Sequence, residues 1–459
     1  GPSGLSGGIL VNVLQMFGYD IPFNDGFIRP IHFVADKGKL VNAEKPAPIG
    51  AGHMNATFKI QEASMATINK MLAASGSPWS ERAMGIWGDN WALHLCHGIN
   101  REGNFDIYIN MDGGGCGGAA FSIRDGIPAA GCPQQCGMDL PDVEFNEMNF
   151  PLFFQFKKLR QNSGGPGRYR GGLGLEYSWS IYHVVKMNTV LFNQRHVVPH
   201  IGMFGAPLVS SSTFVHIKNS DILDRLKSKM PHPTTLEELS GEHVVTSVND
   251  QTTVLSNHDV FYVANLGGGG FGDPISRDPT LVSKDVRDEW VDLTQAEKIY
   301  GVIVLADGTV DEAGTSAARE AIKQQRLAEA TAGSGESHAT GSKEAVVYHH
   351  SPGLDVGCYD NNLMFQCAQS GVIIGPAQKN WKEMVPRIER RIDSRYLKDR
   401  VVEIGLRKDP ALISREYICP VSGVLLEVEL AVEGDPIEHD CRPVHYFKRG
   451  TGEARLQAS

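Results

Sequence analysis

Two short stretches near the end of the chain, FQCAQSG and YICPVSG, repeat a pattern of residues that can bind metal. Each reads Cys-x-x-Ser-Gly, and together they contain Cys367, Ser370, Cys419 and Ser422. Two Cys-x-x-Cys turns at such a separation would hold zinc, because four thiolates can form the tetrahedron that Zn²⁺ prefers. Serine is a poor zinc ligand, so half of each metal-binding turn is absent.

Other thiol and imidazole groups of the tail could complete a metal site with Cys367 and Cys419. The candidates are Cys358, His439 and Cys441, any two of which would give an acceptable set of ligands. The alternative is a metal-free pair of turns that pack against each other. Because a structural zinc requires four ligands, the sequence favours the metal-free alternative and predicts no standard zinc site.

The stretch NSGGPGRYRGGLG, residues 162–174, raises the question of phosphate binding. It lacks the Gly-Lys-Ser/Thr of a P-loop, and Arg170 stands where a dinucleotide-binding motif requires its third glycine. Its two arginines could still hold an anion through paired hydrogen bonds. A rigid turn that leads into the next strand, with glycines at positive φ, is the favoured interpretation.

Two further glycine clusters, NMDGGGCGGAAFS and LGGGGFGDP, occupy residues 110–122 and 266–274. Successive glycines allow a backbone to approach a ligand or another chain segment closely. Neither cluster is followed directly by a helix N-terminus, so the pattern gives little support to an anion site.

The elements that must position these motifs are mostly short strands. Runs of β-type residues, separated by Gly, Pro, Asn and Asp, predict twisted sheets or a barrel between about residues 85 and 320: NFDIYINM, LEYSWSIYHVV, TVLFNQRHVV, TFVHIKN, HVVTSVND and DVFYVANL. Apolar periodicity predicts helices at 9–17 and 61–76, and strong helix formers predict one at 315–331. Residues 28–42 read as two strands around a turn, and Thr294 as a helix N-cap.

The stretch AGSGESHATGS, residues 332–342, is composed of small and polar residues that are typical of a flexible linker. We therefore predict a first unit at residues 1–330, a linker at 331–344 and a tail unit at 345–459. The predicted fold class is α+β, with a β-rich mixed domain, flanking helices and a small C-terminal zinc-knuckle-like domain.

Composition excludes several classes of protein. The net charge of −10 disfavours nucleic acid and anionic membranes as partners. No apolar run reaches the roughly 18 residues that span a bilayer, and the start of the chain lacks a signal-peptide pattern. Eight cysteines in 459 residues are too few for a disulfide scaffold. We predict reduced thiols and a cytoplasmic location.

The order of the motifs SGGPGRYRGGLG and GGGGFGDPISRDPTLVSKDVRDEWVDLTQAEKIYGVIV closely resembles the C-terminal half of the hydantoinase B family. The resemblance covers roughly residues 1–320. That family includes subunits of 5-oxoprolinases, ATP-dependent hydantoinases and acetone or acetophenone carboxylases. The segment SREYICPVSGVLLEVELAVEGDPIEHDCRP resembles the gamma subunit of acetone carboxylases, except that serine replaces the second cysteine of each pair.

The resemblance implies a subunit of an ATP-dependent, biotin-independent carboxylase that adds bicarbonate-derived CO₂ to a ketone. The alternatives are a subunit of an ATP-dependent cyclic-amide hydrolase and a non-catalytic scaffold subunit. The implied partners are a hydantoinase A-like ATP-binding subunit and a chain that carries the N-terminal half of the family's sequence. That half normally holds the ligands of a catalytic metal, so ATP and Mg²⁺ or Mn²⁺ are expected on partner subunits. No catalytic or cofactor-binding residue is assigned to this chain.

Overall fold

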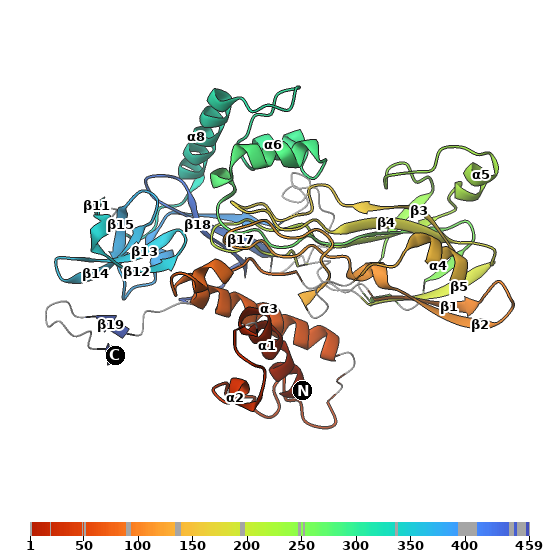
Figure 1. Cartoon of the computed structure of the whole chain (residues 1–459), viewed down its shortest axis with the longest axis horizontal. Helices are drawn as coiled ribbons and strands as arrows, with labels where there is room; N and C mark the ends of the chain where they lie inside the picture. Colours follow the sequence, from red (N-terminus) through yellow and green to blue (C-terminus); the bar gives the residue numbers. More distant parts are fainter. Residues whose placement is uncertain are drawn as a thin grey trace.

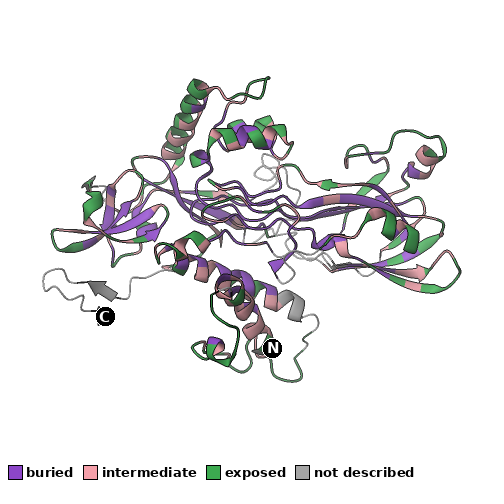
Figure 2. Cartoon of the chain, viewed as in Figure 1, coloured by how far each residue is buried: buried purple, intermediate pink, exposed green. Residues whose placement is uncertain are grey.

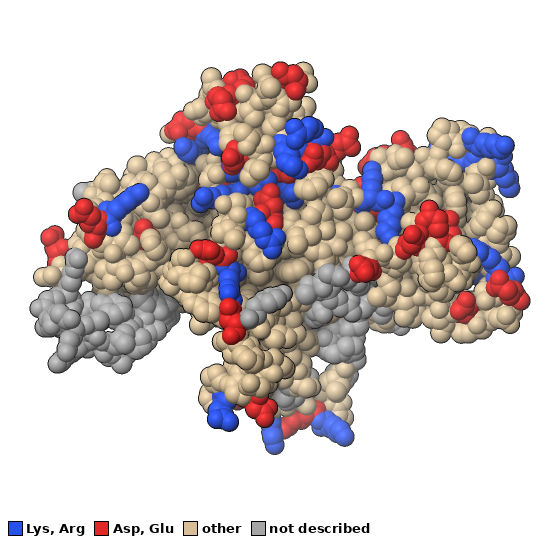
Figure 3. Space-filling model, in the orientation of Figure 1, with Lys and Arg blue, Asp and Glu red and all other residues tan. Residues whose placement is uncertain are grey.

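The computed structural model describes residues 2–18, 20–47, 49, 52–88, 93–133, 139–192, 198–246, 249–250, 253–335, 338–392, 411–439, 445–447 and 456–458. Helices and antiparallel sheets are mixed along the chain (Figure 1), so the coarse prediction of a mixed α and β fold is confirmed. Within these residues, no helix is both long enough and apolar enough to cross a membrane. Acidic and basic side chains are interspersed on the face that Figure 3 shows.

The β-rich unit is a sandwich of two antiparallel sheets. The first sheet has the order β2-β1-β5-β8, with β9 also on β5: β1 Leu93–Ile99, β2 Phe105–Asn110, β5 Lys186–Phe192, β8 Asn249–Asp250 and β9 Val254–Ser256. The second has the order β3-β4-β10-β6-β7: β3 Leu152–Leu159, β4 Leu175–Ile181, β6 Thr213–Lys218, β7 Glu242–Val245 and β10 Val260–Ala264. Buried side chains of both sheets, such as Cys96 and Tyr108 with Trp179 and Phe261, form one core. Each large side chain buried there contributes about 1.5–3 kcal/mol.

Three glycine-rich segments cross the centre of the molecule between this sandwich and the tail (Figure 1). Their backbones are joined by hydrogen bonds from Gly165 N to Gly268 O, from Gly268 N to Gly172 O and from Gly172 N to Gly118 O, at 2.8–2.9 Å. A Cβ atom at Gly268 would lie 1.9 Å from the carbonyl oxygen of Gly118. Only glycine permits this approach, so these residues form a buried structural core and not surface loops.

Helices pack against this glycine-rich core, the sandwich and the tail. Their bounds are α1 Pro2–Phe17, α2 Asp25–Ile28, α3 Gly52–Ala73, α4 Val143–Asn149, α5 Ile222–Lys227, α6 Pro279–Arg287, α7 Leu293–Lys298, α8 Glu312–Glu329 and α9 Trp381–Met384. Short 3₁₀ turns lie at Trp79–Arg82, Met111–Gly114, Pro274–Ser276 and Lys343–Ala345. Met16 of α1 and Met65 of α3 share a core with Phe271 of the third glycine-rich segment. The helices predicted at 9–17, 61–76 and 315–331 are therefore present.

The described residues of the tail form three antiparallel sheets. One has the order β11-β15-β14-β13-β12: β11 His338–Thr340, β12 Val346–Ser351, β13 Leu354–Tyr359, β14 Asn362–Cys367 and β15 Val372–Pro376. The second comprises β16 Arg387–Arg391, β17 Leu412–Ile418 and β18 Leu425–Val432, and in the third β19 His445–Phe447 pairs with β20 Leu456–Ala458. Asp273 binds the tail, because its carboxylate accepts from the backbone N–H of Leu425 at 2.7 Å and from Arg326 of α8 at 2.7 and 3.1 Å. The tail is thus docked on the glycine-rich core (Figure 2).

The segment predicted to be a flexible linker makes backbone hydrogen bonds in its described residues. Thr331 pairs with Arg387 in both directions, Gly335 donates to the carbonyl of Met384, and β11 pairs with β15. Tertiary partners thus give this segment hydrogen bonds that its small polar residues do not predict by themselves. The division into two units stays a prediction.

Two local predictions were wrong. Residues 31–36 form no strand: they find no partner strand, and Val34 is 81% exposed, so only the turn around Gly38 is present. Helix α7 is capped by Asp292 and not by Thr294, since the Asp292 carboxylate accepts from the N–H of Gln295 at 2.6 Å.

Candidate functional site

The two Cys-x-x-Ser turns converge in the tail. Cys367 ends β14, and Cys419 directly follows β17; both thiols are free and both residues are fully buried. In each turn the glycine at positive φ, Gly371 or Gly423, donates its N–H to the carbonyl of the cysteine, at 2.8 or 3.0 Å. The Ser370 hydroxyl lies 3.2 Å from the Cys419 sulfur. The sequence repeat therefore corresponds to two similar turns that face each other.

Hydrogen bonds around the sulfurs of Cys367 and Cys419 favour the thiolate form of Cys419. The hydrogen bond from Cys367 is the largest cause that lowers the pKa of Cys419 to about 5; burial opposes it, and Ser370 and Ser422 add to it. The same hydrogen bond, together with burial, raises the pKa of Cys367. These contacts favour ionisation of Cys419 over ionisation of Cys367.

The additional ligands that the sequence offered do not join this cluster where the structure describes them. Cys358 lies on β13 and packs against the same apolar core, and His439 follows β18. Across the described ranges, no three residues of the types His, Cys, Asp and Glu are close enough to hold a metal ion. Cys441 lies outside the described residues. Two thiols and two hydroxyls are a poor fit for zinc, and the zinc-knuckle part of the predicted fold is not established.

We expect full-length protein to contain no stoichiometric zinc, both as wild type and with Cys419→Ala. The variant should lose about 1 kcal/mol of stability, because it removes one buried sulfur from a turn that apolar neighbours also hold. The thiolate absorbance of the wild type should disappear as the pH falls through about 5 and be absent from the variant. Metal analysis and an ultraviolet pH titration test this, with Cys358→Ala as the control. Zinc that is present in the wild type and lost from Cys419→Ala would contradict the prediction.

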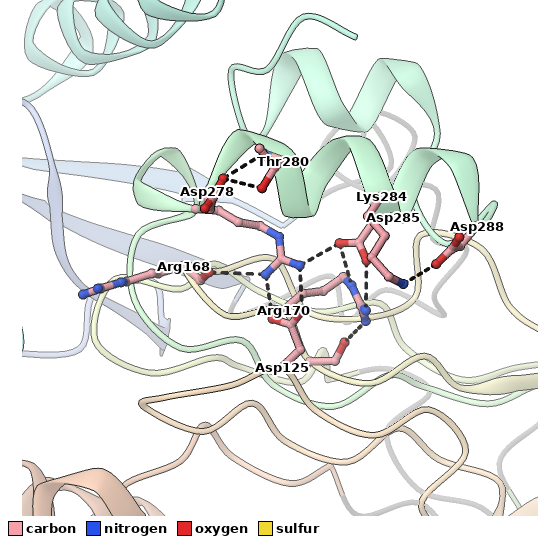
Figure 4. Close-up of polar contacts among 10 residues, drawn as sticks. Asp125, Arg168, Arg170, Asp278, Thr280, Lys284, Asp285 and Asp288 are labelled. Atoms are coloured by element: carbon pink, nitrogen blue, oxygen red, sulfur yellow. Dashed lines mark hydrogen bonds and ion pairs between the residues drawn. The ribbon is translucent and has the colours of Figure 1, made fainter. Parts of the chain in front are cut away.

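A second polar cluster lies at the glycine-rich core, where two buried arginines pair with two aspartates (Figure 4). Arg277 donates to both oxygens of Asp125 at 2.6 and 2.7 Å and to Asp285 at 2.8 Å. Arg170 donates to the two oxygens of Asp285 at 3.1 and 3.3 Å. Both arginines are 1% exposed. Although burial alone would raise it, the hydrogen bonds and charge of Arg277 hold the pKa of Asp125 below its usual value.

This network answers the question of phosphate binding. Arg170, the second arginine of the 162–174 motif, forms an ion pair with Asp285, and its side chain is buried. Arg168 is exposed and points away from the network in Figure 4, while its backbone carbonyl accepts from Arg277 at 3.3 Å. The motif is therefore a structural clamp that ties the glycine-rich segments to helix α6.

Sequence reasoning missed one buried ion pair. The Asp112 side chain is fully buried just after β2, and its Oδ1 lies 2.6 Å from Lys157 Nζ on β3. Burial raises the pKa of Asp112, although Lys157 opposes this effect. Within the described structure, the other oxygen of Asp112 accepts no hydrogen bond. The sequence does place this carboxylate directly after a predicted strand. The glycines that follow it made the stretch look like a loop, so Asp112 was not singled out.

The family described as hydantoinase B/oxoprolinase matches residues 3–274, which is more than half of the chain. The chain belongs to the hydantoinase B/oxoprolinase family. A second family, described as acetone carboxylase gamma subunit, matches residues 355–449 of this hydantoinase B-family chain. The resemblance read from the two long motifs and from the tail is confirmed.

Similar curated proteins are subunits of larger enzymes. Caprolactamase subunit beta of Pseudomonas jessenii is 29% identical over 320 residues, which cover 68% of this hydantoinase B-family chain and 50% of that protein. Acetone carboxylase alpha subunit of Xanthobacter autotrophicus is 30% identical over 247 residues, or 50% of this chain and 32% of that protein. Acetophenone carboxylase delta subunit of Aromatoleum aromaticum is 26% identical over 306 residues, or 62% and 42%.

Solved structures share the fold of this hydantoinase B-family chain. A nucleotide-free acetone carboxylase structure matches with a TM-score of 0.61 at 24% identity, covering 71% of this chain and 45% of that one. The ATP-dependent caprolactamase of Pseudomonas jessenii matches with a TM-score of 0.56 at 23% identity, covering 68% and 50%. The chain thus spans about half or less of the length of these relatives.

Proposed function

We propose that this chain is a subunit of an ATP-dependent, biotin-independent carboxylase that adds bicarbonate-derived CO₂ to a ketone of the acetone or acetophenone type. The observation that carries the proposal is the union of a hydantoinase B unit with an acetone carboxylase gamma unit in one chain. The tail contacts the first unit through Asp273, which accepts from the backbone N–H of Leu425, and through Arg326, which donates to the carbonyl of Gly423. Relatives with acetone and acetophenone carboxylase names support this reading.

The proposed complex contains other chains. A hydantoinase A-like subunit would bind ATP with Mg²⁺ or Mn²⁺ and activate bicarbonate and the ketone. The region that this chain matches is 50% of caprolactamase subunit beta. No nucleic acid or membrane partner is proposed, and the location is cytoplasmic. Catalysis by this chain alone is not proposed, because the chain matches only half of caprolactamase subunit beta.

The second candidate is an ATP-dependent hydrolase of cyclic amides. It is favoured by the match to caprolactamase subunit beta, which covers 68% of this chain, more than acetone carboxylase alpha subunit covers. A scaffold role is the third candidate, since neither buried polar cluster is arranged as a catalytic site.

Release of ADP by the purified complex separates the three candidates. We expect ADP only when acetone or acetophenone is supplied together with bicarbonate, and no inhibition by avidin because no biotin takes part. Caprolactam that drives ADP release without bicarbonate would replace the carboxylase with the hydrolase. A complex whose ADP release does not change when this chain is removed would leave only the scaffold role.

A further inference from the structure

The two facing turns of the tail bring the side chains of Cys367 and Cys419 into contact. Cys367 belongs to the five-stranded sheet through β14, and Cys419 follows β17 of the three-stranded sheet. Both are free thiols buried in one apolar core, and the side chain of Cys367 is hydrogen-bonded to that of Cys419. A disulfide requires two sulfurs that can meet without a large shift of the backbone, and this pair meets that requirement.

The backbone of each turn holds its cysteine in place. Gly371 and Gly423, at φ of 72° and 69°, donate their N–H groups to the carbonyls of Cys367 and Cys419, at 2.8 and 3.0 Å. The N–H of Cys419 in turn donates to the carbonyl of Val424 at 2.9 Å. The contact between the two sulfurs is therefore set by ordered backbone on both sides and not by two mobile side chains.

The sulfurs lie close to the surface although they are buried. Gln369 is exposed at the tip of one turn, and Val421 is 60% exposed at the tip of the other. Each cysteine is thus two residues away from an exposed position in its own turn. A molecule as small as hydrogen peroxide needs only a local opening of one turn to reach the sulfurs, and such openings cost far less than global unfolding.

The two sulfurs are not chemically equivalent. The Ser370 hydroxyl lies 3.2 Å from the Cys419 sulfur, and the hydrogen bonds of the cluster favour ionisation of Cys419 over ionisation of Cys367. The thiolate is the nucleophilic form of cysteine, and a neighbouring thiol can trap its first oxidation product. Cys419 is therefore suited to react first and Cys367 to react second.

We propose that Cys367 and Cys419 are a redox modification site, which a peroxide converts to a reversible disulfide. The Cys419 thiolate attacks one peroxide oxygen, the O–O bond breaks, and hydroxide leaves and takes a proton from water, so that Cys419 becomes a sulfenic acid. The Cys367 thiol then attacks the sulfenic sulfur; the S–O bond breaks, and water leaves with the proton of the thiol. Two sulfurs are oxidised and one peroxide is reduced to two water molecules.

A thiol reductant restores the pair by exchange, so in a reducing compartment the disulfide is transient. The site also lies at the contact between the tail and the first unit, because the carbonyl of Gly423, in the turn of Cys419, accepts from Arg326 of α8 at 3.3 Å. A disulfide there joins the two sheets of the tail beside that contact and restricts the unfolded chain. The inference holds for any of the candidate functions.

Peptide mapping of the full chain tests the proposal. Reduced protein is treated with hydrogen peroxide, digested without reduction and analysed by mass spectrometry. We expect a linked peptide that contains Cys367 and Cys419, is the most abundant linked pair and is lost on treatment with dithiothreitol. Oxidised wild type should unfold at a higher urea concentration than reduced wild type. Cys358→Ala is the control, since Cys358 is the more exposed thiol on the neighbouring strand β13 and its loss should leave the linkage unchanged.

The Cys367→Ala variant separates the two steps. It should form no linked peptide, show no shift of its urea midpoint with peroxide, and accumulate a sulfenic acid at Cys419 that dimedone traps. The map of the wild type does not depend on this variant's folding. Three results in the wild type would overturn the proposal: both cysteines unmodified after peroxide, Cys419 linked mainly to Cys358 or Cys441, or bound zinc whose removal is needed before any linkage forms.

Discussion

Gly268→Ala is expected to leave no stable native state. The added Cβ would lie 1.9 Å from the carbonyl oxygen and 2.3 Å from the carbonyl carbon of Gly118. Both are backbone atoms of a neighbouring segment, so no side chain can rotate away, and the segments must separate. We expect a loss above about 4–5 kcal/mol, which is the size of a marginal protein's whole stability. Denaturant unfolding and soluble yield measure this loss.

Gly7→Ala is the matched control for this substitution. Gly7 lies within α1, and a Cβ there would meet no atom within 4 Å. Since alanine is favoured over glycine inside a helix, stability should rise by about 0.5–1 kcal/mol or stay unchanged. A Gly268→Ala protein as stable as the Gly7→Ala protein would show that the glycine-rich segments are not closely packed.

Arg277→Met is expected to cost about 3–5 kcal/mol, because it removes the cation that pairs with Asp125 and leaves the buried Asp285 with Arg170 alone. Lys284→Met is the control, since Lys284 pairs with Asp288 at the surface and exposed pairs contribute at most about 1 kcal/mol. Urea unfolding of both variants measures the difference. Equal losses would mean that the buried network does not hold the core.

The same network predicts how stability depends on pH. Asp125 has a lowered pKa in the folded protein, so it adds stability above its unfolded pKa of about 3.9, and this stability is lost as the pH falls through the folded value. Stability of the wild type should therefore decrease below about pH 4. In Arg277→Met this part of the decrease should be absent. An identical acid profile in both proteins would assign the acid dependence to other carboxyl groups.

The local pattern of apolar residues was sufficient to predict strands and helices whose formation can be recognised without knowing their tertiary contacts. Period-two alternation identified β2 and β4, and helical periodicity identified α3. Alternation alone could not say which face of β2 is buried, and the polar face turned out to be inside. Composition reports only local preference and could not indicate that β11 pairs with β15.

The candidate site likewise has one part that the sequence predicted and one part that it could not predict. The Cys-x-x-Ser repeat predicted two similar turns, and the structure brings Cys419 within 3.2 Å of Ser370. The role of Arg170 could not be read from its motif, because its partner, Asp285, lies 115 residues away in the sequence. Two arginines among glycines suit an anion and a structural clamp equally well until that partner is known.

The distance in sequence between the parts of the clamp also bears on how the protein is made. Arg277 and Asp125 are separated by 152 residues, and the third glycine-rich segment precedes Arg277 only slightly. At about 5–20 residues per second, a ribosome needs roughly 8–30 s to supply the second member of the pair after the first. Throughout that interval the third glycine-rich segment is absent or incomplete. The hydrogen-bonded core of the three segments therefore cannot form in the nascent chain. The protein should therefore depend on chaperones during synthesis, and ribosomes stalled before Arg277 should release chains that aggregate.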